Sequence, residues 1–151
     1  MNMNRRQAMA MSAGAVIFAS TGLSSTGALA SAEDVDKAMM ELAGGKMPEA
    51  GKVSLTAPEI AENGNTVPIS VEVDSAMADG DMVESITIYA DGNPNPDVVT
   101  FNFSALSGTA MAATRMRLAK TQNVVAVAKM ADGSTYMDKK EVKVTIGGCG
   151  G

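Results

Sequence analysis

Histidine and tryptophan are absent from the sequence, cysteine occurs once, and aromatic residues make up only 3% of the 151 residues. Without histidine, the chain lacks the usual general base and the commonest metal ligand. A Cys-His nucleophilic pair, a zinc site built from several cysteines and histidines, and a C-x-x-C-H haem attachment site therefore cannot form. A single cysteine also excludes an intramolecular disulfide framework. These absences argue against autonomous catalysis, and we expect no resident metal or cofactor.

Positive charge is scarce as well. The chain has 12 lysine and arginine residues against 17 aspartate and glutamate residues, which gives a formal net charge of −5. Nucleic acids and anionic membrane surfaces attract basic proteins, so this balance argues against both as partners. It keeps the protein soluble and favours partners with basic surfaces.

The N-terminus has the pattern of an export signal. Asn4-Arg5-Arg6-Gln7 is a twin-arginine start, the apolar run 13–19 follows, and Ala28-Leu29-Ala30 forms a small-residue cleavage site. We predict a twin-arginine signal over residues 1–30, cleavage near Ala30 and a periplasmic mature protein. An ordinary secretory signal is the alternative. Because the apolar run is shorter than the ~18 residues of a permanent span, we expect no membrane attachment after cleavage.

Apolar periodicity predicts one helix followed by a series of strands. Val35, Met39 and Leu42 fall at helical spacing, which predicts a helix over 34–42 that ends at Gly44-Gly45. Strands are predicted where apolar and polar residues alternate, or where an apolar run lies between turn residues. These segments are 53–55, 67–73, 83–90, 99–103, 115–118, 124–130 and 136–146.

Two of these segments and one turn show how the strands are arranged. Pro68 lies near the start of its segment, which indicates a strand beginning or an exposed edge. Segment 124–130 is almost wholly apolar, as in a central strand buried on both faces, and Asp132-Gly133 predicts a hairpin turn after it. Short strands with regular turns predict an all-β fold over residues 31–146, an immunoglobulin-like antiparallel β-sandwich with a short N-terminal helix.

The C-terminus, residues 147–151, places the only cysteine between two pairs of glycines: Gly147, Gly148, Cys149, Gly150 and Gly151. Glycine offers no side chain to pack and many backbone conformations, so we predict a flexible arm of at most about 16–18 Å. The nearest basic residue in sequence is Lys143, so nothing in the local sequence activates the thiol. The segment favours a carrier whose thiol is presented to partner enzymes. An unpaired secreted cysteine that forms intermolecular disulfides, or is inert, is the alternative.

Other motifs are better explained by structure than by chemistry. Residues 91–97 begin like a calcium-binding loop but lack its glycine and its bidentate glutamate, so we interpret them as a turn. Arg115 and Arg117 fit a solvated strand face better than an anion site. A terminal Gly-Gly also occurs in ubiquitin-like sulfur carriers, but those need ATP-dependent activation and a longer helix. The methionines are expected to fill core gaps or cover an adaptable surface: Met77, Met82, Met111, Met116, Met130 and Met137.

With these residues in view, the chain from about Gly51 to Gly151 resembles the SoxY family, the sulfur-carrier subunits of bacterial thiosulfate-oxidising Sox systems. The resemblance lies in several motifs of the body together with the GGCGG tail. The matching motifs are Ala57-Pro58-Glu59-Ile60-Ala61-Glu62-Asn63-Gly64 with Val67-Pro68, Ala90-Asp91-Gly92-Asn93-Pro94-Asn95-Pro96, Thr114-Arg115-Met116-Arg117-Leu118-Ala119 and Ala126-Val127-Ala128-Lys129-Met130.

The resemblance implies a non-catalytic carrier that works with partner enzymes. SoxY proteins form a heterodimer with SoxZ and hold the substrate covalently on the tail cysteine, here Cys149, with the four glycines as a swinging arm. A c-type cytochrome loads thiosulfate, and a dimanganese hydrolase releases sulfate. In systems that possess it, a molybdenum-haem sulfane dehydrogenase oxidises the remaining sulfur. A structural or thiol-redox protein is the alternative, although thiol-disulfide exchange within one chain would need a second cysteine.

Overall fold

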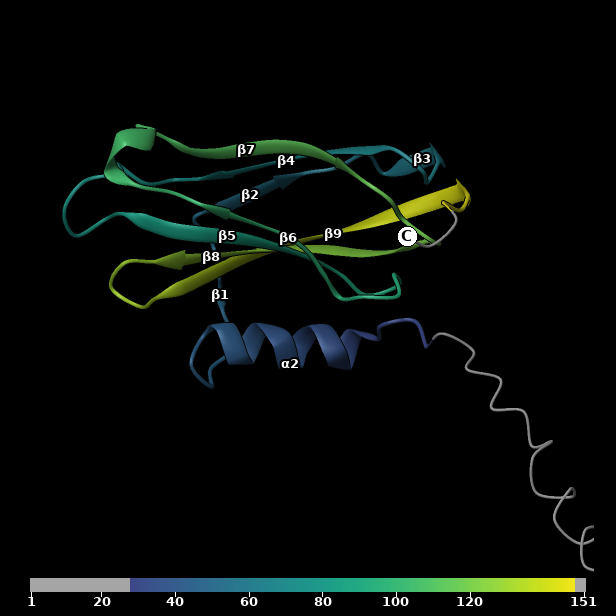
Figure 1. Ribbon diagram of the computed structural model, residues 1–151, viewed down its shortest axis with the longest axis horizontal. Helices are drawn as coiled ribbons and strands as arrows, with labels where there is room; N and C mark the ends of the chain where they lie inside the picture. The colour runs from purple at the N-terminus through teal and green to yellow at the C-terminus, as the bar shows by residue number, and fades with distance from the viewer. Residues whose placement is uncertain (1–27, 149–151) are drawn as a thin grey trace, which may run out of the picture.

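The computed structural model describes residues 28–148. Two β-sheets pack face to face, and one helix, α2 (Ala32–Leu42), covers the outer face of the larger sheet (Figure 1). The predicted all-β sandwich with a short N-terminal helix is confirmed. Most of the predicted signal, residues 1–27, lies outside the described residues. In the part that the structure describes, no helix is long and apolar enough to cross a membrane.

The larger sheet has six strands and carries the C-terminus. β8 lies at its centre between β9 and β5, and each of these pairs with it in the antiparallel direction. Its main order is β1 (Glu49–Ala50), β9 (Thr135–Ile146), β8 (Gln122–Met130), β5 (Val83–Ala90) and β6 (Asp97–Asn102), and β3 (Ile60–Asn63) also pairs with β9.

The smaller sheet has three strands, in the order β2 (Val53–Thr56), β4 (Val67–Val73) and β7 (Ala110–Met116). β4 alternates between buried and outward residues, as its sequence predicts. Pro68 lies in this central strand, yet β2 reaches only as far as the Thr56–Ser70 pair. At Pro68 the strand therefore has β7 as its only sheet neighbour, which explains how a residue without an N–H is accommodated.

β8 is buried on both faces, as predicted. Its inward residues Val124, Ala126 and Ala128 belong to the main core between the sheets, and all three are fully buried. Its outward residues Val125 and Val127 form a second cluster with α2. The near-continuous apolar run of this strand therefore reflects two separate cores, one on each side.

α2 begins and ends at clear sequence signals. The hydroxyl of Ser31 accepts a hydrogen bond from the amide of Asp34, and the Asp34 carboxylate accepts one from the Ser31 amide, forming a capping box. The bonds from the Ser31 backbone and hydroxyl lower the pKa of Asp34. Gly44 and Gly45, with φ values of 71° and 99°, terminate the helix.

The structure differs from the predicted strands at three places. β1 and β3 run parallel to β9, so the sandwich is not wholly antiparallel. β7 begins at Ala110 in a stretch of small residues where no strand is predicted. It ends at Met116, so Leu118 lies beyond the strand, although it is fully buried. A short 3-10 helix, η1 (Ala105–Ser107), joins β6 to β7.

Candidate functional site

The predicted site lies at the end of β9. Gly147 and Gly148 are the last described residues, and Cys149, Gly150 and Gly151 lie outside the described residues. The structure therefore places the base of the tail but not the thiol. Gly147 is exposed, whereas Gly148 is buried.

β3 holds the last part of β9. β8 pairs with β9 only as far as the Gln122–Val142 pair, and beyond it β9 pairs with β3, from Ile60–Lys143 to Asn63–Ile146. β3 and the end of β9 lie together at one end of the sandwich (Figure 1). The short segment β3 is thus what continues the sheet to the start of the tail.

Three backbone hydrogen bonds follow where the strand pairing stops. The Gly64 amide donates to the Ile146 carbonyl at 2.8 Å, the Leu118 amide donates to the Gly64 carbonyl at 2.8 Å, and the Gly148 amide donates to the Leu118 carbonyl at 2.9 Å. These bonds join the end of β3, the β7–β8 connection and the tail. The base of the tail therefore contacts two segments that are distant from it in sequence.

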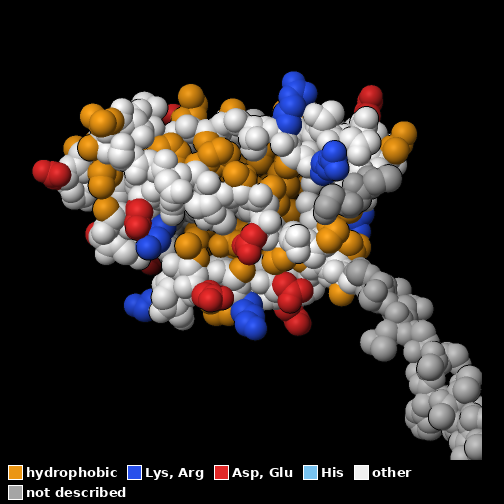
Figure 2. Space-filling model, viewed as in Figure 1, with side chains coloured by type: hydrophobic (Ala, Val, Ile, Leu, Met, Phe, Trp, Pro, Cys, Tyr) orange, Lys and Arg blue, Asp and Glu red, His pale blue; other side chains and the backbone are white. Residues whose placement is uncertain are grey.

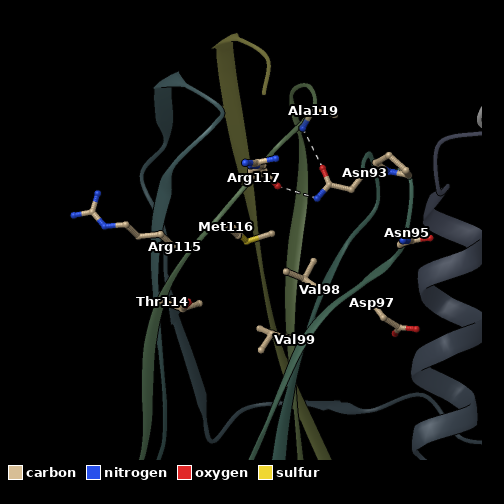
Figure 3. A pocket seen from close by; sticks show the side chains of 11 residues that line it. Asn93, Asn95, Asp97, Val98, Val99, Thr114, Arg115, Met116, Arg117 and Ala119 are labelled. Atoms are coloured by element: carbon tan, nitrogen blue, oxygen red, sulfur yellow. Dashed lines mark hydrogen bonds between the residues drawn. The ribbon is translucent and has the colours of Figure 1, made fainter. Parts of the chain in front are cut away.

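The β7–β8 connection is itself fixed by the side chain of Asn93, from the β5–β6 turn (Figure 3). The Asn93 amide group donates to the Arg117 carbonyl at 2.8 Å, and its oxygen accepts from the Ala119 amide at 3.0 Å. Gln122 is buried, donates to the Asn93 oxygen at 2.9 Å and accepts from the Gly92 amide at 2.7 Å. This polar network immobilises the segment that receives Gly148.

A groove of about 250 Å³ lies between β6 and β7, beside this network. Val98, Val99 and Met116 point into it, and Arg115 extends away from it (Figure 3). Apolar side chains are visible along the middle of this face (Figure 2). β6 and β7 are edge strands of the two sheets, and the groove between them leaves part of the main core exposed.

Residues 91–97, which begin like a calcium-binding loop, make structural contacts. The Asp91 carboxylate accepts hydrogen bonds from both the backbone amide and the side-chain amide of Asn123, at 2.8 and 2.7 Å. Asn93 holds the β7–β8 connection through its own hydrogen bonds. The interpretation of residues 91–97 as a structural turn therefore agrees with the contacts. Among residues 28–148, no group of His, Cys, Asp or Glu side chains is arranged to hold a metal.

The methionines have mixed environments. Met77, Met116 and Met130 are buried in the main core, in agreement with the prediction that methionines fill gaps there. Met111 is 58% exposed on β7. Arg115 and Arg117 are both exposed, as expected for a solvated strand end.

The β7–β8 connection, which contacts the base of the tail, carries two positively charged side chains. Arg117 and Lys120 are exposed and lie on the β7–β8 connection, whose Leu118 carbonyl accepts the hydrogen bond from the Gly148 amide. Both are about thirty positions from Cys149 in the chain, so the sequence alone does not link them to the tail, and the fold brings their segment to Gly148.

Comparison with known proteins identifies the family. Residues 39–149 match the family model described as sulfur oxidation protein SoxY. The structure is similar to that of the sulfur carrier protein SoxY from Chlorobium limicola f thiosulfatophilum, with a TM-score of 0.62 and 32% identity. That similarity covers 75% of this chain and 93% of the Chlorobium chain.

The same architecture occurs in other proteins. A superoxide reductase (neelaredoxin) from Ignicoccus hospitalis superposes with a TM-score of 0.56 at 17% identity, over 77% of this chain and 94% of that one. At this identity the likeness concerns the fold alone. No curated protein matches the chain. The family match runs across the sandwich and the base of the tail to Cys149, and the chain belongs to the SoxY family.

Proposed function

We propose that this protein is a covalent sulfur carrier in thiosulfate oxidation, with Cys149 as the attachment site. The observation that carries the proposal is the family match, which extends to residue 149 and so includes the only cysteine of the chain. The similar Chlorobium protein is a sulfur carrier protein. A rigid sandwich that delivers its last strand to a cysteine-bearing tail suits this role. The protein itself performs no catalysis in this proposal.

In the carrier cycle the free thiol of Cys149 is converted first to an S-thiosulfonate and then to a persulfide. A c-type cytochrome joins thiosulfate to the Cys149 thiol, which forms an S–S bond, releases one proton and passes two electrons to the cytochrome. A dimanganese hydrolase then adds water to the terminal sulfonate and releases sulfate, which leaves a persulfide on Cys149. In systems that possess it, a molybdenum-haem sulfane dehydrogenase oxidises the remaining sulfur atom.

The residues of this chain bind and present the intermediate. A persulfide exchanges readily with other thiols, so a covalent tether keeps it from being lost between enzymes. The tether also raises the effective concentration of the intermediate without tight protein–protein contacts. The bond from the Gly148 amide to the Leu118 carbonyl holds the start of the tail against the sandwich.

SoxZ is the proposed partner, in a heterodimer that forms the working carrier. We propose a periplasmic location after export by the twin-arginine route and cleavage near Ala30. Because this route carries folded proteins, a partner without its own signal could cross the membrane in complex with this chain. A partner that carries its own cleaved signal would remove the basis for that idea.

Intact mass of the protein purified from its host, with and without reductant, tests the carrier function. We expect a reductant-labile adduct of sulfur or thiosulfonate mass that maps to Cys149. A bare thiol, or only a Cys149-linked dimer, in cells that are oxidising thiosulfate would favour the structural or redox alternative. The Cys149→Ser variant is the control, and it should lose the adduct and retain the fold and partner binding.

A further inference from the structure

Three glycines meet at the base of the tail with no space for a side chain. A Cβ on Gly64 would lie 2.3 Å from the Leu118 carbonyl oxygen and 2.7 Å from the Gly148 nitrogen. A Cβ on Gly148 would lie 2.8 Å from the Gly64 oxygen. A Cβ on Gly147 would lie 2.2 Å from the Ala119 oxygen. These neighbours are backbone atoms, so no side-chain rotation relieves the contacts.

The close approach coincides with the backbone hydrogen bonds at the end of β9. Gly64 donates to Ile146 and accepts from Leu118, and Leu118 in turn accepts from Gly148. Both Gly64 and Gly148 are buried, and the Leu118 side chain is fully buried in the main core. Three chain segments thus approach one another through their backbones, and glycine is what permits it at two of them.

The segments that receive the tail also make contacts of their own with the sandwich. Leu118 is anchored by its side chain and by the Asn93 network on either side of it. Gly64 follows β3, which pairs with β9. The Val144 amide, close to the tail, also donates to the Thr121 hydroxyl at 2.9 Å. At Leu118 the tail therefore docks against a segment that other contacts already fix.

We propose that Gly64, Leu118 and Gly148 form a backbone clasp, and that Gly64 is a positioning residue that fixes where the cysteine-bearing tail leaves the domain. Cys149 follows Gly148 directly in the sequence, so the clasp fixes the backbone position from which the residue that bears the thiol continues. Gly147 and Gly148 then serve close packing at the end of the described chain. The consequence for sulfur transfer rests on the proposed function, but the clasp itself does not.

Amide hydrogen exchange, followed by NMR on the mature protein, tests the clasp. The Gly148 amide should be protected in the wild type, and both Gly64→Ala and Gly148→Ala should speed its exchange. One hydrogen bond corresponds to about a two- to tenfold change in such an equilibrium, so at least this increase is expected. The amides of Val125 and Val127 in β8 should keep their protection, which distinguishes a local opening from general destabilisation.

Two matched control variants show whether an effect is specific to the clasp. The second clasp variant, Gly148→Ala, keeps the test decisive if Gly64→Ala fails to fold. Asn65→Ala changes the exposed neighbour of Gly64, and Gly150→Ala adds the same methyl group two residues beyond Gly148. Both should leave the exchange of the Gly148 amide unchanged. Because Gly148 lies after the last strand, Gly148→Ala leaves the body of the sandwich intact even if Gly64→Ala does not fold.

Thiosulfate-dependent loading in a host cell extract, read by intact mass, tests the positioning role. Gly64→Ala should load more slowly than wild type and Asn65→Ala, while its thiol reacts at least as fast with a small disulfide reagent. Unchanged exchange of the residue 148 amide in both variants would overturn the clasp. Faster exchange with unchanged loading would overturn the positioning role. Failure of the wild type to load would count against the carrier function, and the exchange result would still decide the clasp.

Discussion

The side-chain oxygen of Asn93 accepts a 3.0 Å hydrogen bond from the backbone amide of Ala119, across 26 residues of sequence. The same side chain donates to the carbonyl of Arg117. Asn93 thus spans the segment that contains Leu118 and fixes it from both sides. The turn after β5 and the connection that receives the tail are therefore one structural unit.

Asn93→Ala should destabilise the domain by about 1–3 kcal/mol, because it leaves the partly buried amide of Ala119 and the buried amide group of Gln122 without their shared acceptor. Urea denaturation gives the change in the free energy of unfolding. Asn95→Ala is the matched control, because Asn95 is exposed in the same turn. Equal unfolding free energies for the two variants would contradict the structural role of Asn93.

Met39→Ala should cost about 2–4 kcal/mol of stability, because Met39 is 2% exposed and packs between α2 and the six-stranded sheet. Met40→Ala, on the exposed side of the same helix, should change the stability by less than about 0.5 kcal/mol. Thermal or urea unfolding of the two variants makes the comparison. Met39 belongs to the cluster on the α2 side of the sheet and not to the main core, so sulfur loading by Met39→Ala should equal that of wild type.

Strands with a buried face were predictable from sequence, and the short strands β1 and β3, which pair in parallel with β9, were not. β4 and β5 show the pattern that burial imposes, and their predicted bounds agree with the structure. β3 has one buried residue out of four, and its Ile60 is 61% exposed, so no alternation marks it as a strand. Its pairing partner lies some eighty residues away in β9, and a parallel pairing over that distance leaves no local signal.

The tail was predictable as a feature, and its contacts were not. Two pairs of glycines around the only cysteine are visible in the sequence itself. Glycine, however, has two uses, conformational freedom and close backbone approach, and the sequence does not distinguish them. At Gly64 and Gly148 the structure shows close approach. The partners of these residues come from segments that only the folded sheet brings together.

Tyr89 should make the protein sensitive to alkaline pH. Burial against α2, with a smaller contribution from the charge of Asp97, raises the pKa of Tyr89 to about 12. A raised pKa in the folded state means that the stability is fully present below pH ~10 and is lost as the pH rises through about 12. At about pH 11.5 the loss from this group should be on the order of 2 kcal/mol.

Tyr89→Phe removes the titrating group and keeps the ring. Its urea midpoint should fall less than that of wild type between about pH 8 and pH 11.5. Tyr136→Phe is the control for general effects of high pH, because Tyr136 is only half-buried. Parallel declines in wild type, Tyr89→Phe and Tyr136→Phe would show that Tyr89 does not govern the alkaline transition.

Gly150→Val tests whether the tail must thread a narrow channel in the partner enzymes. Gly148→Val cannot isolate this effect, because a Cβ there would also meet the Gly64 oxygen at 2.8 Å and open the clasp. A β-branched side chain at position 150 adds bulk next to the cysteine in the sequence and leaves Gly148 itself unchanged. We expect thiosulfate loading to fall roughly tenfold or more, since small misplacements of a reacting group are costly. The rate with a small disulfide reagent should stay within about twofold of wild type, because the thiol keeps its chemical environment. Loading at the wild-type rate would refute threading, and close packing at Gly147 and Gly148 would remain the role that the structure supports for glycine in the tail.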